Sequence, residues 1–143
     1  MRRVFIFLAL SQGVLLSVTA AKADRENERR SDADYVLSGK VTCVYACEST
    51  GYRHYIVEIM IEDVDKGPGL RKGGTFRAYC YQRKPGFDGL EYDTTGHTLV
   101  PKAGQRVKMF VNGLRGRNEG VYPDWVDVIE ESAEKGLKPA QRR

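Results

Sequence analysis

The sequence predicts an all-β fold, a small five-stranded barrel, and three observations support this prediction. Apolar side chains recur at every second position on both sides of a polar turn at residues 48–51, which is the period of a β-strand. Further extended stretches follow, separated by residues typical of turns. No stretch shows the periodicity of an amphipathic helix. An open, sandwich-like β domain is the alternative architecture.

The first two strands are expected at residues 35–46 and 53–64. In the first, one face is expected to carry Leu37, Gly39, Val41, Cys43 and Tyr45. In the second, the face without charge is the expected core side, and it carries Tyr55, Val57, Ile59 and Ile61. Glycine inside a strand commonly marks a bend, so we expect Gly39 to bend the first strand as a small barrel requires.

Three further strands are expected at residues 75–82, 106–112 and 121–129. Residues 83–105 form a long loop between the third and fourth strands, with four glycines, two prolines and no helical periodicity. Such a long loop in a small domain is usually functional or disordered. Residues 112–120 are expected to form a glycine-rich basic loop.

The first 23 residues have the pattern of a secretory signal peptide. A basic start precedes a largely apolar stretch of about 15 residues, and small residues flank Lys22 at the expected cleavage site. This stretch is shorter than the roughly 20 residues of a membrane-spanning helix. The protein is therefore expected to be exported, periplasmic or secreted, without a stable membrane span after cleavage. An uncleaved N-terminal anchor is the alternative.

Composition divides the rest of the chain into a charged leader at 24–34, a β domain at 35–129 and a charged tail at 130–143. The leader and the tail are poor in large apolar residues and are expected to be disordered. The chain has 23 basic and 19 acidic side chains. Removing residues 1–23, which hold three basic and no acidic residues, leaves 20 against 19, a net charge of +1. Nucleic acid is therefore an unlikely partner.

Three cysteines, Cys43, Cys47 and Cys80, remain after cleavage. In an oxidising compartment one disulfide and one free thiol are expected. Cys43 and Cys47 would lie about 13 Å apart in one extended strand, too far to pair. Cys80 is therefore the expected partner of one of them, and we favour Cys47–Cys80.

The order of the expected strands resembles the OB-fold, as in a small exported bacterial domain. The features that carry the resemblance are the bent first strand with Gly39, a meander of three strands, a long insertion after the third strand, and a final hairpin. The entry to the fourth strand at residues 100–107 is also similar. Many OB-folds have a helix between the third and fourth strands, and residues 83–105 do not predict one. The resemblance concerns the fold of residues 35–129 and implies no specific activity.

The resemblance also implies a place where a ligand would bind, because OB-folds bind on the outer face of strands two and three and on adjoining loops. On that face Glu58 and Met60 are expected beside the candidate ligand-binding residues. The candidate ligand-binding residues are Arg77, Tyr79, Tyr81, Tyr52, Arg53, Arg115 and Arg117. Tyrosine rings and guanidinium groups can stack on ligands and bind anions. Ordinary solvated surface is the alternative interpretation.

The leading functional hypothesis is an exported, non-catalytic binding module for a partner protein or a glycan of the cell envelope. The sequence contains no recognisable catalytic motif, and we expect no cofactor. The alternative is a thiol- or metal-handling envelope protein, for copper or zinc, that uses Cys47, Cys80 and His54. His97 from the long loop would complete a four-ligand site, although the spacing matches no known metal motif.

Overall fold

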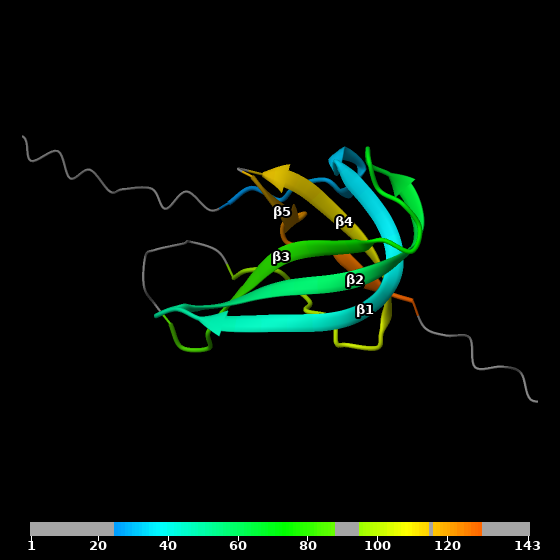
Figure 1. Cartoon of the computed structure of the whole chain (residues 1–143). Coiled ribbons are helices and arrows are strands. Elements are labelled where there is room, and N and C mark those ends of the chain that lie inside the picture. The colour runs from blue at the N-terminus through cyan, green and yellow to red at the C-terminus, as the bar shows by residue number, and fades with distance from the viewer. Residues whose placement is uncertain (1–24, 88–94, 115, 130–143) are drawn as a thin grey trace, which may run out of the picture.

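The computed structural model describes residues 25–87, 95–114 and 116–129. The described chain is a closed, five-stranded, antiparallel-rich β-barrel with one short additional strand and almost no helix (Figure 1). This confirms the predicted all-β fold and is consistent with the OB-like arrangement. The expected signal peptide (1–23) and the expected tail (130–143) lie outside the described residues.

The strands are β1 (Tyr35–Glu48), β2 (Tyr52–Lys66), β3 (Thr75–Arg83), β4 (Arg106–Leu114), β5 (Arg117–Gly120) and β6 (Val126–Val128). They are hydrogen-bonded in the order β1-β2-β3-β5-β4, and β4 pairs with β1 to close the sheet. The β3–β5 contact is the one parallel pairing among the described strands. β6 pairs antiparallel with residues 107–109 of β4. Closure requires β1 to pair with both β2 and β4, so the curvature of this strand determines whether the barrel can close.

β1, which contains Gly39, is strongly curved (Figure 1). The β1–β2 register shifts three times, between Val36 and Leu37, between Ser38 and Gly39, and between Val41 and Cys43. A Cβ atom at position 39 would lie 2.2 Å from the carbonyl oxygen of Met60. Only glycine therefore permits this close approach of the two strands, as the sequence predicts for a bent strand.

The barrel interior is filled by alternate side chains of the strands, with Trp125 closing one end. The fully buried members include Leu37, Val41, Val57, Ile59, Ala78, Cys80, Val107, Met109 and Val111. The expected core face of the second strand is confirmed, since Val57, Ile59 and Ile61 are buried. The regular alternation expected along β1 is wrong beyond Val41. The extra residue at the bulge turns Cys43 and Tyr45 outward and brings Val44 against the core.

The C-terminal part also differs from the expectation of a loop at 112–120 followed by one strand at 121–129. β4 continues to Leu114, which pairs with Arg117 at the start of β5 in a tight hairpin. Gly116 supplies the positive φ of +79° that this turn needs. Glycine-rich sequence therefore encodes the hairpin turn here, and the chain leaves the sheet later, at residues 121–125, before β6.

Residues 25–34, expected as part of a disordered leader, lie against the barrel in the structure. A short 3₁₀ turn, η1 (Arg30–Asp32), precedes β1, and Ala33 is fully buried. The Arg30 guanidinium binds both carboxylate oxygens of Asp127 at 2.9 Å. This segment has little apolar surface to bury. Ion pairs with the C-terminal strands hold it against the barrel instead.

The described parts of the long loop, residues 84–87 and 95–105, contain no helix. Residues 95–97 run beside the end of β3, where Arg83 and His97 form backbone hydrogen bonds with Thr95 and Tyr81 respectively. Gln105 and Gly104 bond the backbone of Val41 on β1. Among the described residues, no helix has the length and apolar character needed to cross a membrane.

Candidate ligand-binding face

The outer surface of β1, β2 and β3 is a three-stranded face on which outward side chains form rows. Pairing across the strands aligns Tyr45 with Ile56 and Ile56 with Tyr79. Tyr45 is 51% exposed and Ile56 is 43% exposed. We call the row Tyr45–Ile56–Tyr79 the central row. It places a strip of aromatic and aliphatic side chains across the middle of this face, exposed at Tyr45 and Ile56 and half-buried at Tyr79.

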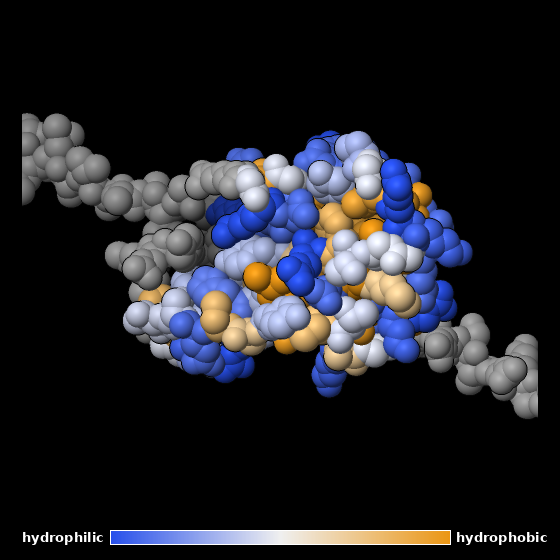
Figure 2. Space-filling view, viewed as in Figure 1, coloured by the Kyte–Doolittle hydropathy of each residue, from blue (hydrophilic) through white to orange (hydrophobic). Residues whose placement is uncertain are grey.

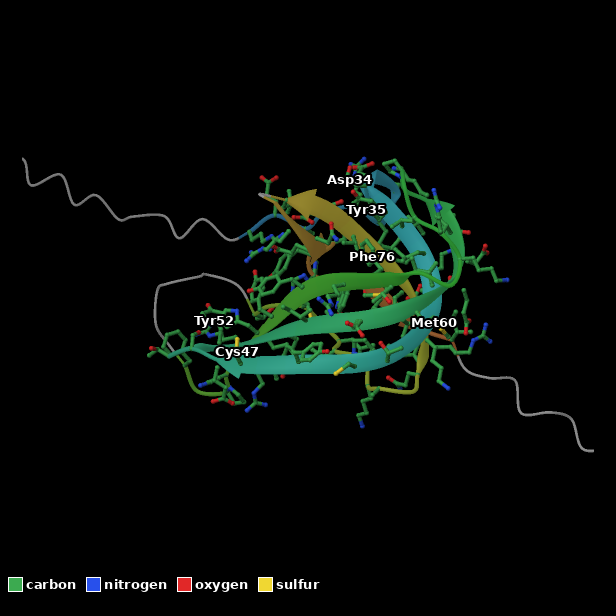
Figure 3. All side chains as sticks on the ribbon, in the orientation of Figure 1. Asp34, Tyr35, Cys47, Tyr52, Met60 and Phe76 are labelled. Carbon is green, nitrogen blue, oxygen red and sulfur yellow. The ribbon has the colours of Figure 1, made fainter. Side chains whose placement is uncertain are left out.

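The row toward the tip of the β1–β2 hairpin contains Cys47, His54 and Tyr81. The row on the other side contains Cys43, Glu58 and Arg77. Figure 3 shows Cys47 near the projecting end of the hairpin and Met60 near its opposite end. Met60 is 45% exposed and lies one row further along, beyond the ion pair of Glu58 and Arg77.

Tyr79 is held in place by two polar neighbours. Its hydroxyl lies 2.7 Å from Nδ1 of His54, and the two rings are nearly parallel with centroids 6.0 Å apart. The Arg117 guanidinium lies over the Tyr79 ring, 4.0 Å from the centroid. Burial, followed by the nearby charge of Arg117, lowers the pKa of His54 from its ordinary value. The His54 imidazole is therefore neutral near pH 7 and adds no charge to the face.

Arg117 is itself positioned by a buried carboxylate, Glu119. The Arg117 Nη2 atom lies 2.7 Å from Oε2 of Glu119, and Arg25 Nη1 lies 2.5 Å from Oε1. The Glu119 side chain is only 4% exposed. Burial raises the pKa of Glu119, but the hydrogen bonds from Arg25 and Arg117 outweigh it and hold the pKa below its ordinary value. Glu119 is therefore ionised and fixes Arg117 against Tyr79.

Arg77 flanks the central row on the side opposite His54. The Arg77 Nε atom lies 2.7 Å from Oε2 of Glu58. The other carboxylate oxygen of Glu58, Oε1, accepts a hydrogen bond from the Thr42 hydroxyl. These bonds, with the Arg77 hydrogen bond as the largest cause, lower the pKa of Glu58. The Arg77 side chain is 65% exposed and that of Glu58 is 17% exposed. The guanidinium is thus the part of this pair that solvent reaches.

Two of the tyrosines predicted to bind ligand are buried instead. Tyr81 is 7% exposed and Tyr52 is fully buried, although both lie on the outer face of the sheet. Tyr52 packs edge-on against Tyr81 and Phe87, and Tyr81 packs edge-on against His97. The long loop thus covers this end of the face, which alternation along the strands could not reveal.

His97 fastens the loop over the buried tyrosines. Nε2 donates to the carbonyl oxygen of Gly120 at 2.8 Å, and Nδ1 accepts from the Tyr81 N–H at 3.2 Å. Burial lowers the pKa of His97, in keeping with this neutral tautomer. His97 therefore has a structural position, with both ring nitrogens occupied.

The predicted loop arginines separate into different environments. Arg53 alternates with His54 on β2 and so points to the opposite side of the hairpin, where it pairs with Glu48 at 2.7 Å. Arg117, expected in a loop, belongs to β5 and reaches the face. Arg115 lies outside the described residues.

The expected Cys47–Cys80 disulfide is wrong, and all three cysteines of the described chain are free. Cys47 is exposed on β1, whereas Cys80 is fully buried on β3 and points into the barrel. β2 lies between them, which separates their strands by roughly 10 Å, beyond the reach of a disulfide. Pairing would also need Cys80 to leave the core.

The four side chains of the alternative metal hypothesis are not brought together. Cys47 lies opposite His54 on the outer face. Cys80 lies in the core, and His97 is held by backbone groups. Within the described ranges, no group of three His, Cys, Asp or Glu side chains has a geometry that could hold a metal ion.

Tyr45, Ile56 and His54 belong to the face but are not among the predicted ligand-binding residues. The outward position of Ile56 and His54 follows from their alternation with the core residues of β2 and could be inferred from the sequence. Tyr45 could not, because the bulge before Cys43 leaves no signature in this sequence. Arg25 and Glu119 were missed because they meet across 94 residues of chain.

Comparison of the chain with protein-family models, with curated proteins and with solved structures found no match. The functional interpretation therefore rests on the geometry of the chain itself.

Proposed function

We propose that the protein is an exported, non-catalytic binding module that recognises a partner protein through the face of β1, β2 and β3. The observation that carries the proposal is the central row, Tyr45–Ile56–Tyr79, which is exposed at Tyr45 and Ile56 and has Arg77 and Arg117 beside it. Apolar and aromatic centres with polar margins are typical of protein-recognition surfaces. The space-filling view shows small hydrophobic patches among mainly hydrophilic residues on the visible side of the barrel (Figure 2).

The accessible charge beside the central row is positive. Arg77 and Arg117 are 65% and 54% exposed, whereas their partners Glu58 and Glu119 are 17% and 4% exposed. Both guanidinium groups are fixed by these carboxylates and need little ordering when a ligand arrives. The face therefore suits a partner whose contact surface has an apolar centre and acidic margins.

A protein fits this face better than a glycan does. Sugars stack on open aromatic rings and need an array of polar groups, whereas Ile56 and Met60 offer aliphatic surface. Tyr52 and Tyr81 are covered by the long loop, and the Tyr79 ring lies under the Arg117 guanidinium, which leaves Tyr45 as the one exposed tyrosine ring on the described face. Localisation in the cell envelope is proposed from the signal-like pattern of residues 1–23.

The thiol- or metal-handling hypothesis has less support, because its residues lie apart. Cys80 would have to leave the barrel core to meet Cys47 and His54. Burial, with a smaller effect of the nearby Glu119 charge, raises the pKa of the Cys80 thiol. The thiolate that metal binding or redox exchange requires is therefore disfavoured there.

The proposal is tested by affinity capture from the native envelope with the purified protein as bait, compared with the Ile56→Ser and Arg77→Glu variants. We expect one protein to be retained by the wild type and lost with both variants, because one removes apolar contact and the other reverses the charge. Binding of the purified partner should then be measured by calorimetry.

Val128→Ser is the matched control, since Val128 is a 37% exposed aliphatic residue on β6, outside the proposed face. It should retain the partner, and all variants should keep the wild-type melting temperature within a few degrees. Equal retention by Ile56→Ser and the wild type would contradict the proposal. Retention that survives protease treatment of the envelope but not glycosidase treatment would identify a glycan instead.

A further inference from the structure

Within the described ranges, one edge of the sheet is open along the second half of β1. Residues 36–40 of β1 pair with both β2 and β4, and loop residues Gly104 and Gln105 bond Val41. Beyond that point β1 pairs only with β2 among the described residues. Figure 1 shows this part of the hairpin projecting beyond the barrel, with β1 at its border.

The direction of the free backbone groups follows from the hairpin register. The N–H of Ser49 donates to the carbonyl oxygen of Tyr52 at 2.9 Å, and the register continues without a shift back to Cys43. Hydrogen-bonded and non-hydrogen-bonded pairs alternate in an antiparallel ladder. The N–H and C=O groups of Val44, Ala46 and Glu48 therefore point away from β2, toward the open edge.

This edge lacks the usual protection against pairing with another strand. Natural edges carry lysine, proline or an inward charge, or are covered by other segments. Residues 43–47 read Cys-Val-Tyr-Ala-Cys, with no charge and no proline. A bulge can also protect an edge, but the bulge of β1 lies before Cys43. Residues 43–48 are in regular register with β2.

The two cysteines of this edge, Cys43 and Cys47, are placed symmetrically about Tyr45, and this placement favours a second copy of the chain as the occupant. If a second copy pairs antiparallel with a two-fold axis at Tyr45, Val44 faces Ala46 of the other copy in a hydrogen-bonded pair. Cys43 then faces Cys47 of the other copy in a non-hydrogen-bonded pair. Cα atoms in such a pair are about 4.5 Å apart, within the range of an unstrained disulfide.

We propose that two copies of this chain join edge to edge through β1 and that two Cys43–Cys47 disulfides between the copies lock the dimer. Cys43 is half-buried, Cys47 is exposed, and neither has a disulfide partner within its own chain. Glu48 faces Thr42 of the other copy, so no like charges oppose each other. The two central rows join into one six-stranded face, and the pairing does not depend on the proposed function.

Each disulfide forms by thiol–disulfide exchange with a small-molecule disulfide, for which oxidised glutathione is the test reagent. A cysteine thiolate of one copy attacks it and forms a mixed disulfide, releasing one reduced glutathione. The facing cysteine of the other copy attacks the mixed disulfide and releases the second. Two bridges therefore consume two oxidised glutathione molecules and release four reduced ones.

The test is to incubate the reduced, purified protein with oxidised glutathione and to separate the products by non-reducing electrophoresis and intact mass. We expect a species of twice the chain mass that dithiothreitol returns to monomer. Peptide mapping should link Cys43 to Cys47 and leave Cys80 unlinked. A protein that remains monomeric, or bridges that link Cys43 to Cys43, would overturn the proposal.

Single variants provide the decisive comparison, because each removes one member of every pair. Cys43→Ser alone and Cys47→Ser alone should form no covalent dimer. An equimolar mixture should form a dimer with one bridge, since one variant supplies Cys43 and the other Cys47. Dimers of either single variant alone, or no dimer in the mixture, would contradict this geometry. Cys80→Ala is the control and should dimerise like the wild type.

Discussion

At the scale of single residues, Glu119 links the N-terminal segment to the candidate binding face. Its carboxylate accepts hydrogen bonds from Arg25 and Arg117 while its side chain is nearly inaccessible to solvent. Arg25 also bonds Glu28 at 2.6 Å and lies over the Tyr122 ring. A buried carboxylate with two guanidinium partners is stable as a set, but the loss of one member leaves the others desolvated without compensation.

Glu119→Gln should lower the free energy of unfolding by about 2 to 3 kcal/mol, because Arg25 and Arg117 lose their charged acceptor. The loss should depend on pH. The folded pKa of Glu119 lies below its ordinary value of 4.5, so the unfolded chain takes up the proton first as the pH falls. The difference between wild type and variant is therefore full above about pH 5 and declines as the pH falls through 4.5.

Urea unfolding at several pH values measures this difference. Arg77→Gln is the comparison, since it breaks an ion pair whose arginine is 65% exposed. It should cost much less than Glu119→Gln, because solvent screens an exposed ion pair. A Glu119→Gln loss no larger than that of Arg77→Gln, or one that grows at low pH, would show that the buried network is unimportant.

At the scale of elements, β1 decides both the fold and the face. The curve at Gly39 allows the strand to pair with β2 and β4 together. The bulge between Val41 and Cys43 then exchanges the two faces of the strand, so that Tyr45 joins Ile56 and Tyr79 outside. β1 thus contributes side chains to the core in its first half and to the proposed recognition surface in its second half.

Gly39→Ala should destabilise the barrel by about 1 to 3 kcal/mol, because the new Cβ atom would overlap the carbonyl oxygen of Met60 at 2.2 Å. Relief would require β1 and β2 to separate at the curve. Gly113→Ala is the matched control, since its Cβ atom would meet its nearest neighbour, on Tyr35, at 3.6 Å. Thermal and chemical unfolding of both variants measure the effect. Equal stability of Gly39→Ala and Gly113→Ala would mean that the strand can relax without cost.

At the scale of the whole molecule, closure of the barrel separates the three thiols into two classes. Cys43 and Cys47 lie on the outer face, while Cys80 is enclosed with no exposed surface. Reaching Cys80 requires the sheet around it to open. Its accessibility therefore reports the stability of the entire barrel.

A chromogenic thiol reagent should modify two thiols per chain in the native, reduced protein and the third only under denaturing conditions. Burial raises the pKa of Cys80 and adds to the protection by disfavouring the thiolate. The rate of the third reaction should increase with denaturant in parallel with global unfolding. Rapid modification of Cys80 in the native protein would contradict an enclosed core.

The strands of the barrel could largely be predicted because they depend on local pattern. Alternation along β2 and β3 identifies their core faces, and Gly39 marks the curve. The site could be predicted only in part, since Tyr79 and Arg77 follow from alternation on β3. The burial of Tyr52 and Tyr81 depends on a loop that approaches from elsewhere in the chain, and no periodicity encodes that approach.

The sequence by itself determined that this chain forms an all-β barrel with a bent first strand, because periodic apolar side chains and turn residues act over a few neighbouring positions. Only the tertiary structure decided that no two cysteines of one chain pair, that residues 25–34 bind the barrel, and that Tyr45 faces outward. Each of these outcomes depends on which strands become neighbours, and on one inserted residue that reverses the faces of a strand.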